Sequence, residues 1–150
     1  MRKIFTIGFT RKTAEEFFKT LEENGVKKII DVRFNNTSQL LGFSKYPDIE
    51  YFLRELIGAE YFHDKKFAPS EKILKRYKKH LIGWDDYEKE FADLMDYRDI
   101  DVYITDKYAK ADNICLLCTE VSSENCHRRL VAEKIAEVLE DVEIIHLGED

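Results

Sequence analysis

Residues 115–129, CLLCTEVSSENCHRR, concentrate the side chains of this sequence that are best suited to chemistry. The segment contains all three cysteines of the chain, together with one histidine, two arginines and glutamate. Such a set has four interpretations: a metal site, a thiol active site, a cradle for an anion, or a strand and a helix that merely contain reactive side chains.

Cys126 is the strongest candidate nucleophile in the segment. Helix signals from Ser123 onward place it in the first turn of a helix, where unpaired N–H groups and the helix dipole favour a thiolate. Arg128 adds positive charge nearby. Cys115 and Cys118 form a C-x-x-C pair, but a strand points residues three apart to opposite faces, so we do not expect a redox pair. A small buried thiol in the core is the alternative for Cys126.

Zinc is a second interpretation of the same residues. Cys118, Cys126 and His127 could ligate the ion, with His146 as a candidate fourth ligand. Their spacing is not a standard zinc pattern, and adjacent ligands on a helix point about 100° apart. His127 could instead face the sheet and hydrogen-bond to the backbone. We therefore predict no metal and no identified cofactor, with zinc as the minority alternative.

The position of Arg33 suggests a binding site for an anion. It follows the buried run IIDV directly, where a charge is costly unless it is paired or faces a ligand. Arg33, Arg128 and the helix N-terminus expected near Ser123 together suggest an anion site. A structural ion pair of Arg33 with Asp31 or Glu120 is the alternative.

The elements that position these residues follow from hydrophobic spacing. Apolar runs of strand length alternate with segments of helical periodicity, which predicts one α/β domain over residues 1–150, with a mainly parallel sheet of about four to five strands flanked by helices. Strands are expected at 3–9, 26–32, 59–63, 113–119 and 142–147, and helices after the caps at Thr13 and Ser70, from Asp48, over 84–95 and from about Ser123. Residues 98–112 are the least regular part, and 101–105 could form an edge strand.

Topology would bring the candidate residues together. In parallel sheets, ligands bind beyond the carboxyl ends of the strands. The groups at those ends are Thr10, Arg11, Asp31, Arg33, Cys118, Glu120, Cys126, His127, Arg128 and His146.

Composition limits the class of protein. The chain has 150 residues, 44% of them hydrophobic, which is enough for one core without disulfides. Three cysteines and no recognisable signal peptide indicate a reducing, cytoplasmic location. The opening run MRKIFTIGF is too short to span a membrane, and no membrane partner is expected. The oligomeric state cannot be inferred.

The net charge of −6 disfavours a general nucleic-acid binder, but residues 63–80 carry a net charge of +5. A solvated helix face explains this segment most simply. The alternative is a phosphate or nucleic-acid patch, in which Tyr61, Phe62, Phe67 and Tyr77 would supply stacking surfaces. Its cations are Lys65, Lys66, Lys72, Lys75, Arg76, Lys78 and Lys79.

The motifs FTIGFT, IIDVRFNNTS, GFSK, YFH and LLCTEVSSENCHRRLVAE resemble, in order, those of the DUF488 family of unknown function. The most specific part is L-C-x-E-x₅-C-H-R, from Leu117 to Arg128. Phe9 and Thr10 stand where the family usually has histidine and serine, and the usual Gly-rich segment after YFH is absent, so the chain resembles a divergent member. The resemblance implies motif roles, but no reaction, for Asp31, Arg33, Ser38, Lys45, Cys118, Glu120, Cys126, His127 and Arg128.

Two classes of function follow. The first is an enzyme acting on a phosphorylated or nucleotide-like small molecule, with Arg33 and Arg128 holding the anion, assisted by Thr10, Ser38 and Lys45. Glu120 or Asp31 would then act as acid or base, and Cys126 or Cys118 as nucleophile, with His127 beside them. The second is a module that binds an anion or nucleic acid without chemistry. A buried polar network that only fixes the strand-to-helix connection is the third, structural possibility.

Overall fold

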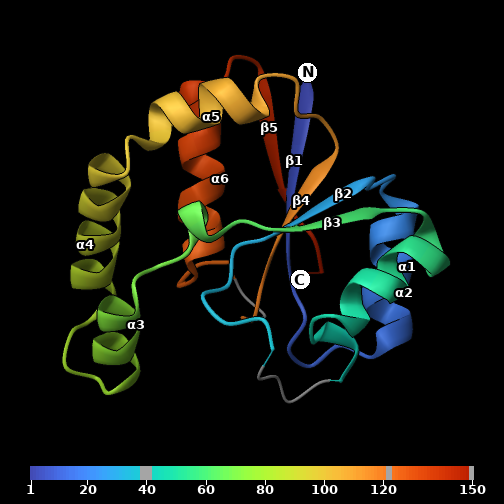
Figure 1. Cartoon of the computed structure of the whole chain (residues 1–150), viewed down its shortest axis with the longest axis horizontal. Coiled ribbons are helices and arrows are strands. Elements are labelled where there is room, and N and C mark those ends of the chain that lie inside the picture. Colours follow the sequence, from blue (N-terminus) through green and yellow to red (C-terminus); the bar gives the residue numbers. More distant parts are fainter. Residues whose placement is uncertain (38–41, 121–122, 149–150) are drawn as a thin grey trace.

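The computed structural model describes residues 1–37, 42–120 and 123–148. Five strands form one fully parallel sheet in the order β3-β2-β4-β1-β5, which confirms the predicted α/β class (Figure 1). The strands are β1 (Arg2–Gly8), β2 (Lys28–Asp31), β3 (Glu60–His63), β4 (Ile114–Cys118) and β5 (Val142–His146). The helices are α1 (Ala14–Glu23), α2 (Asp48–Ile57), α3 (Glu71–Lys78), α4 (Trp84–Tyr97), α5 (Ile100–Tyr108) and α6 (His127–Val138), with short 3-10 turns at Gly42–Ser44 and Lys65–Phe67.

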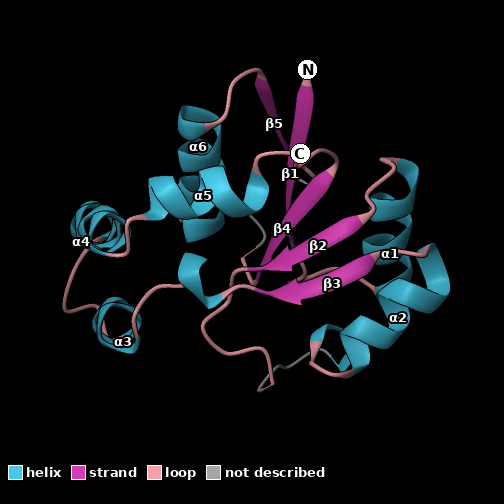
Figure 2. Cartoon of the chain, turned by 45° about the horizontal axis from the view of Figure 1, so that its top comes forward, coloured by secondary structure: helices cyan, strands magenta, loops and turns pink. Residues whose placement is uncertain are grey.

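Helices cover both faces of the sheet, so the central strands have two buried sides. Successive residues of β1 show this: Ile4 belongs to the core under α4, α5 and α6, whereas Phe5 belongs to the core under α1 and α2. This is the period-two alternation of a strand. Every residue of β4 is buried, which is typical of a parallel strand with both faces covered. Figure 2 shows α3 and α4 side by side, on the opposite side of the sheet from α1 and α2.

The predicted caps of α1 and α3 are confirmed. Thr13 accepts a hydrogen bond from the backbone N–H of Glu16, and Ser70 accepts one from that of Ile73. Both side chains satisfy an N–H group that the first helical turn leaves without a partner.

The expectation of an edge strand at 101–105 is wrong, because this segment belongs to α5. Ile100, Ile104 and Tyr108 recur every four residues and are all buried, which places them on one face of a helix. The edges of the sheet are β3 and β5, and residues 101–105 pair with neither of them.

The last helix begins later than expected. α6 starts at His127, and Cys126 is its N-cap residue in an extended conformation, instead of lying in a first turn that begins near Ser123. Ser122, another expected helix signal, lies outside the described residues. Cys126 therefore still adjoins the positive end of the helix dipole.

Nothing in the described chain has both the length and the apolar character of a membrane-crossing helix.

Candidate functional site

A pocket of about 520 Å³ opens at the carboxyl ends of the strands. Its sheet side is formed by the segments that leave β1, β2 and β4 and by the start of α6. Its other side is formed by α3, α4 and the residue before the cap of α3. The lining residues are Phe9, Thr10, Arg11, Arg33, Phe34, Asn35, Pro69, Leu74, Tyr77, Lys78, Trp84, Tyr87, Cys118, Thr119, Glu120, Asn125, Cys126 and His127. Residues from four separate parts of the chain thus share one cavity, at the place where parallel sheets usually bind ligands.

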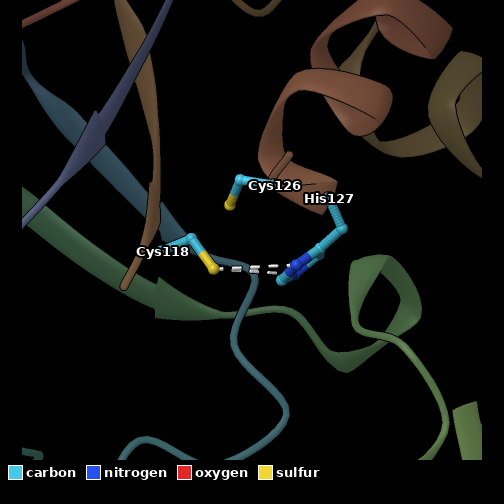
Figure 3. Close-up of side chains that lie close together, drawn as sticks. All are labelled: Cys118, Cys126 and His127. Carbon is cyan, nitrogen blue, oxygen red and sulfur yellow. Dashed lines mark hydrogen bonds between the residues drawn. The ribbon is translucent and has the colours of Figure 1, made fainter. Parts of the chain in front are cut away.

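Cys118, Cys126 and His127, which all line this pocket, form a compact cluster (Figure 3). Cys118 comes from the end of β4, and the other two side chains come from the start of α6. The Cys118 sulfur lies 3.6 Å from Nδ1 of His127, and the three potential ligand atoms lie within 4.8 Å of one another. All three side chains are buried.

A backbone hydrogen bond fixes the orientation of His127. Its Nε2 donates to the carbonyl oxygen of Val32 at 2.6 Å, which leaves Nδ1 to face the sulfurs. Phe91 of α4 packs against the imidazole ring at a centroid distance of 5.7 Å. The expectation that His127 faces the sheet and bonds to the backbone is therefore confirmed, and the same bond aims the ring at both cysteines.

The two sulfurs of the cluster differ in charge. The hydrogen bond donated by Cys118 lowers the pKa of Cys126 well below its ordinary value; burial opposes this, whereas His127 and the positive charge of Arg128 lower the pKa further. The pKa of Cys118 is raised well above its ordinary value by the same hydrogen bond and by burial. These directions favour the thiolate on Cys126 and the thiol on Cys118.

These side chains also have the chemistry of metal ligands. Two sulfurs and one imidazole suit Zn²⁺, and three protein ligands with a fourth position open to a pocket is the arrangement of catalytic zinc. The hydrogen bond from Nε2 to Val32 is of the kind that orients metal-bound histidines. His146 is not available as a fourth ligand, because its Nδ1 lies 2.5 Å from the hydroxyl of Thr6 and its side chain does not line the pocket.

Arg33 lies beside this cluster and is only 3% exposed. Asp31 holds its guanidinium through two hydrogen bonds, from Nε at 2.8 Å and from Nη2 at 2.6 Å, and the carbonyl oxygen of Ser44 accepts a third at 2.8 Å. Burial lowers the pKa of Arg33, but the contacts with Asp31 outweigh it and raise that pKa. The guanidinium is also stacked over the ring of Phe9, at 5.1 Å from its centroid.

One donor of Arg33 remains unused. Within the described chain, its Nη1 is buried and has no hydrogen-bond partner. A buried N–H donor without an acceptor costs about 1–3 kcal/mol, and more on a charged group. Arg33 therefore forms the ion pair with Asp31 that was the structural alternative for it, and it also lines the pocket.

Arg128 is placed differently from Arg33. It is fully buried and does not line the pocket. Its Nη1 donates to the carbonyl oxygen of Glu120 at 2.6 Å, and its Nε contacts the hydroxyl of Thr6 at 3.3 Å. Gly8 lies against the same carbonyl, since a Cβ at this position would come within 1.5 Å of it. Arg128 thus fixes the segment after β4, and its predicted role in holding an anion stays a prediction.

The other predicted site residues are dispersed. Asp31 is fully buried, and its carboxylate accepts hydrogen bonds from Arg33 and from the hydroxyl of Tyr61, the latter at 2.5 Å. The hydroxyl of Thr10 lines the pocket and donates to the carbonyl oxygen of Thr119 at 2.5 Å. Glu120 is exposed at the pocket, whereas Lys45 is exposed and does not line it. Ser38 lies outside the described residues.

The aromatic side of the pocket was not predicted. Tyr77, Trp84 and Tyr87 line it together with the cations Arg11 and Lys78. The helical spacing of Trp84 and Tyr87 indicated only a helix over 84–95, and nothing local in the sequence shows that α3 and α4 line a pocket with the sheet edge. Two other aromatic residues considered for stacking are buried instead: Tyr61 is 8% and Phe67 1% exposed.

Comparison with known proteins bears on the family alone. The model of the family described as "Domain of unknown function DUF488" matches residues 13–135, a range that includes the whole Cys118–Cys126–His127 cluster and Arg33. No curated protein and no solved structure matches the chain. The chain belongs to the DUF488 family.

Proposed function

We propose that this protein is an enzyme that acts on a phosphorylated or nucleotide-like small molecule, with Cys126 as the attacking thiolate. One observation carries the proposal: Cys126 and Arg33, 93 positions apart in the sequence, line the same pocket, and Nη1 of Arg33 is buried with no hydrogen-bond partner within the described chain. Phosphate oxygens are the acceptors that a guanidinium binds best, so the anion of the ligand would occupy this donor.

The remaining groups have roles consistent with this arrangement. The sulfur of Cys126 forms a bond to an electrophilic carbon or phosphorus of the ligand, and the leaving group departs with the electron pair of the broken bond. Glu120, exposed at the pocket, exchanges a proton with the leaving group or with the water that later releases the ligand. Asp31 does not touch the ligand; it positions Arg33.

Alkylation at graded pH tests the thiolate. The purified protein is first analysed for metal, then treated with iodoacetamide between pH 6 and 9, and each cysteine is followed by peptide mass spectrometry. From pH 9 to pH 7, the rate for free cysteine falls about 25-fold, because its pKa is about 8.5. The alkylation rate of Cys126 should fall less than threefold over the same pH range.

Cys115 is the matched control, because it is a buried cysteine outside the pocket and its thiol pKa is raised by burial. It should stay unmodified in the folded protein. A rate for Cys126 that follows free cysteine would end the proposal, and so would one zinc per chain that is lost in Cys118→Ser and Cys126→Ser but retained in Cys115→Ser.

A module that binds nucleic acid is the second candidate, and one feature of α3 favours it. Lys72, Lys78 and Lys79 are exposed and have no ion pair within the described chain, whereas Lys75 pairs with Glu71 and Arg76 with Glu90. Salt-dependent binding to oligonucleotides that disappears when Lys72, Lys78 and Lys79 are changed to Gln would support this candidate. No binding at low salt would remove it.

A further inference from the structure

The pocket has two chemically different sides. The sheet side contains Cys118, Cys126, His127 and Arg33, whereas α3 and α4 contribute mainly apolar and aromatic side chains, together with one cation, Lys78. Phe91 of α4 packs against the ring of His127, so α4 contacts the thiol cluster through an aromatic side chain. A ligand that fills both sides must therefore combine an anionic, reactive part with a flat apolar part.

The aromatic side is a preassembled wall of three rings. Trp84 and Tyr87 are stacked with their centroids 4.9 Å apart and their planes 16° from parallel. The ring of Tyr77 packs against both, with its centroid 5.0 Å from that of Tyr87 and 5.8 Å from that of Trp84. Tyr87 is buried, whereas Trp84 and Tyr77 are partly exposed where the pocket meets solvent. Since the rings hold one another, a planar ligand ring can stack on them without ordering new side chains, and base–aromatic stacking contributes about 1–3 kcal/mol per base.

Two exposed cations line the pocket in addition to Arg33. Arg11 follows β1 on the sheet side, whereas Lys78 lies in α3 on the aromatic side. Arg11 has a φ of 64°, a left-handed conformation that is unusual for a residue with a side chain, directly after the first strand. A cavity of about 520 Å³ lies within the range of sites for small molecules and cofactors.

We infer that the ligand is a nucleotide, with its base stacked on Tyr77 and Trp84 and its phosphate at Arg33. This inference rests on the proposed function, and it adds that the aromatic wall selects for a nucleobase. A sugar phosphate would use only the charged side. An apolar molecule without charge would leave the Nη1 donor of Arg33 unsatisfied.

Trp84 is the only tryptophan in the chain, so its fluorescence reports on the wall directly. AMP, GMP, CMP, UMP and ribose 5-phosphate are titrated into the full chain, with affinities measured in parallel by calorimetry. At least one nucleotide should quench the fluorescence and bind tenfold or more tightly than ribose 5-phosphate.

Variants separate the two sides of the pocket. Trp84→Ala and Tyr77→Ala should reduce the advantage of the nucleotide over ribose 5-phosphate by at least tenfold, whereas Arg33→Gln should weaken both ligands. Tyr97→Ala is the matched control, because Tyr97 lies at the end of α4 and is 87% exposed. Circular dichroism confirms that each variant is folded.

The outcomes also separate this inference from the proposed function. If ribose 5-phosphate binds as tightly as all four nucleotides, the nucleotide inference fails and the phosphate-binding enzyme stands. The inference also fails if the nucleotide advantage survives in Trp84→Ala and Tyr77→Ala. If neither ligand binds and the alkylation of Cys126 follows free cysteine, both fail.

Discussion

Nε2 of His127 lies 2.6 Å from the carbonyl oxygen of Val32, the residue that precedes Arg33. This single hydrogen bond joins the start of α6 to the segment after β2, across 95 positions of the sequence. It also fixes which ring nitrogen faces Cys118 and Cys126. The segment that contains Arg33 and the cluster that contains the two sulfurs are therefore joined directly.

Replacing His127 tests this connection. His127→Ala leaves the carbonyl oxygen of Val32 buried without its donor, which should lower the free energy of unfolding by about 1–3 kcal/mol in urea denaturation. It also removes a group that lowers the pKa of Cys126, so the alkylation of Cys126 at pH 7 should slow. An unchanged alkylation rate in a folded variant would show that His127 does not support the thiolate.

Gly8→Ala tests the close approach of β1 to the segment after β4. The added Cβ would come within 1.5 Å of the carbonyl oxygen of Glu120, which Arg128 holds in place. We expect the free energy of unfolding, measured by urea denaturation, to fall by at least about 2 kcal/mol, since the backbone of this segment must move. Gly42→Ala is the control, because a Cβ there meets no atom of the described residues within 4 Å. Equal stability of the two variants would contradict the packing at Gly8.

The thiolate should make stability depend on pH. The pKa of Cys126 is lower in the folded chain than the value of about 8.5 in the unfolded chain, so its contribution is fully present above that value and is lost as the pH falls through the folded pKa. The stability of the wild type relative to Cys126→Ser should therefore increase with pH up to about 8.5. Cys118, whose pKa is raised, contributes in the opposite direction only above that range. If the stability difference between the wild type and Cys126→Ser is constant or decreases as the pH rises, Cys126 is protonated.

Two side-chain substitutions test whether α5 buries only one of its faces. Ile104 is fully buried, so Ile104→Ala should cost about 2–5 kcal/mol in urea denaturation. Val102, in the same helix, is 60% exposed, and Val102→Ala should change stability by less than about 0.5 kcal/mol. Similar costs at both positions would contradict the one-sided burial of the helix.

Much of the fold was predictable because the decisive signals are local. The apolar runs at β1, β2 and β4, and the caps Thr13 and Ser70, depend on residues close in sequence. The exception is α5, where the apolar residues are so interspersed with charges that a four-residue spacing and a two-residue alternation both fit a short window. Tertiary packing against α6 selects the helix.

The site was predictable only in part. Parallel strands bring their carboxyl ends together, so Arg33 and Cys126 could be assigned to one edge from topology alone. The difference between Arg33 and Arg128 was not visible, because whether an arginine faces a pocket or a backbone carbonyl depends on distant segments. The aromatic wall depends on the packing of α3 against α4, for which Trp84 gave no local signal.

The most direct test compares two alkylating reagents at Cys126. Iodoacetate is an anion and iodoacetamide is neutral, and the two form similar adducts. If Arg33 holds anions beside Cys126, the ratio of the iodoacetate rate to the iodoacetamide rate should be at least tenfold higher at Cys126 than for free cysteine, and Arg33→Gln should remove this preference. The same ratio in the wild type, in a folded Arg33→Gln variant and in free cysteine would contradict a shared anion and thiolate site.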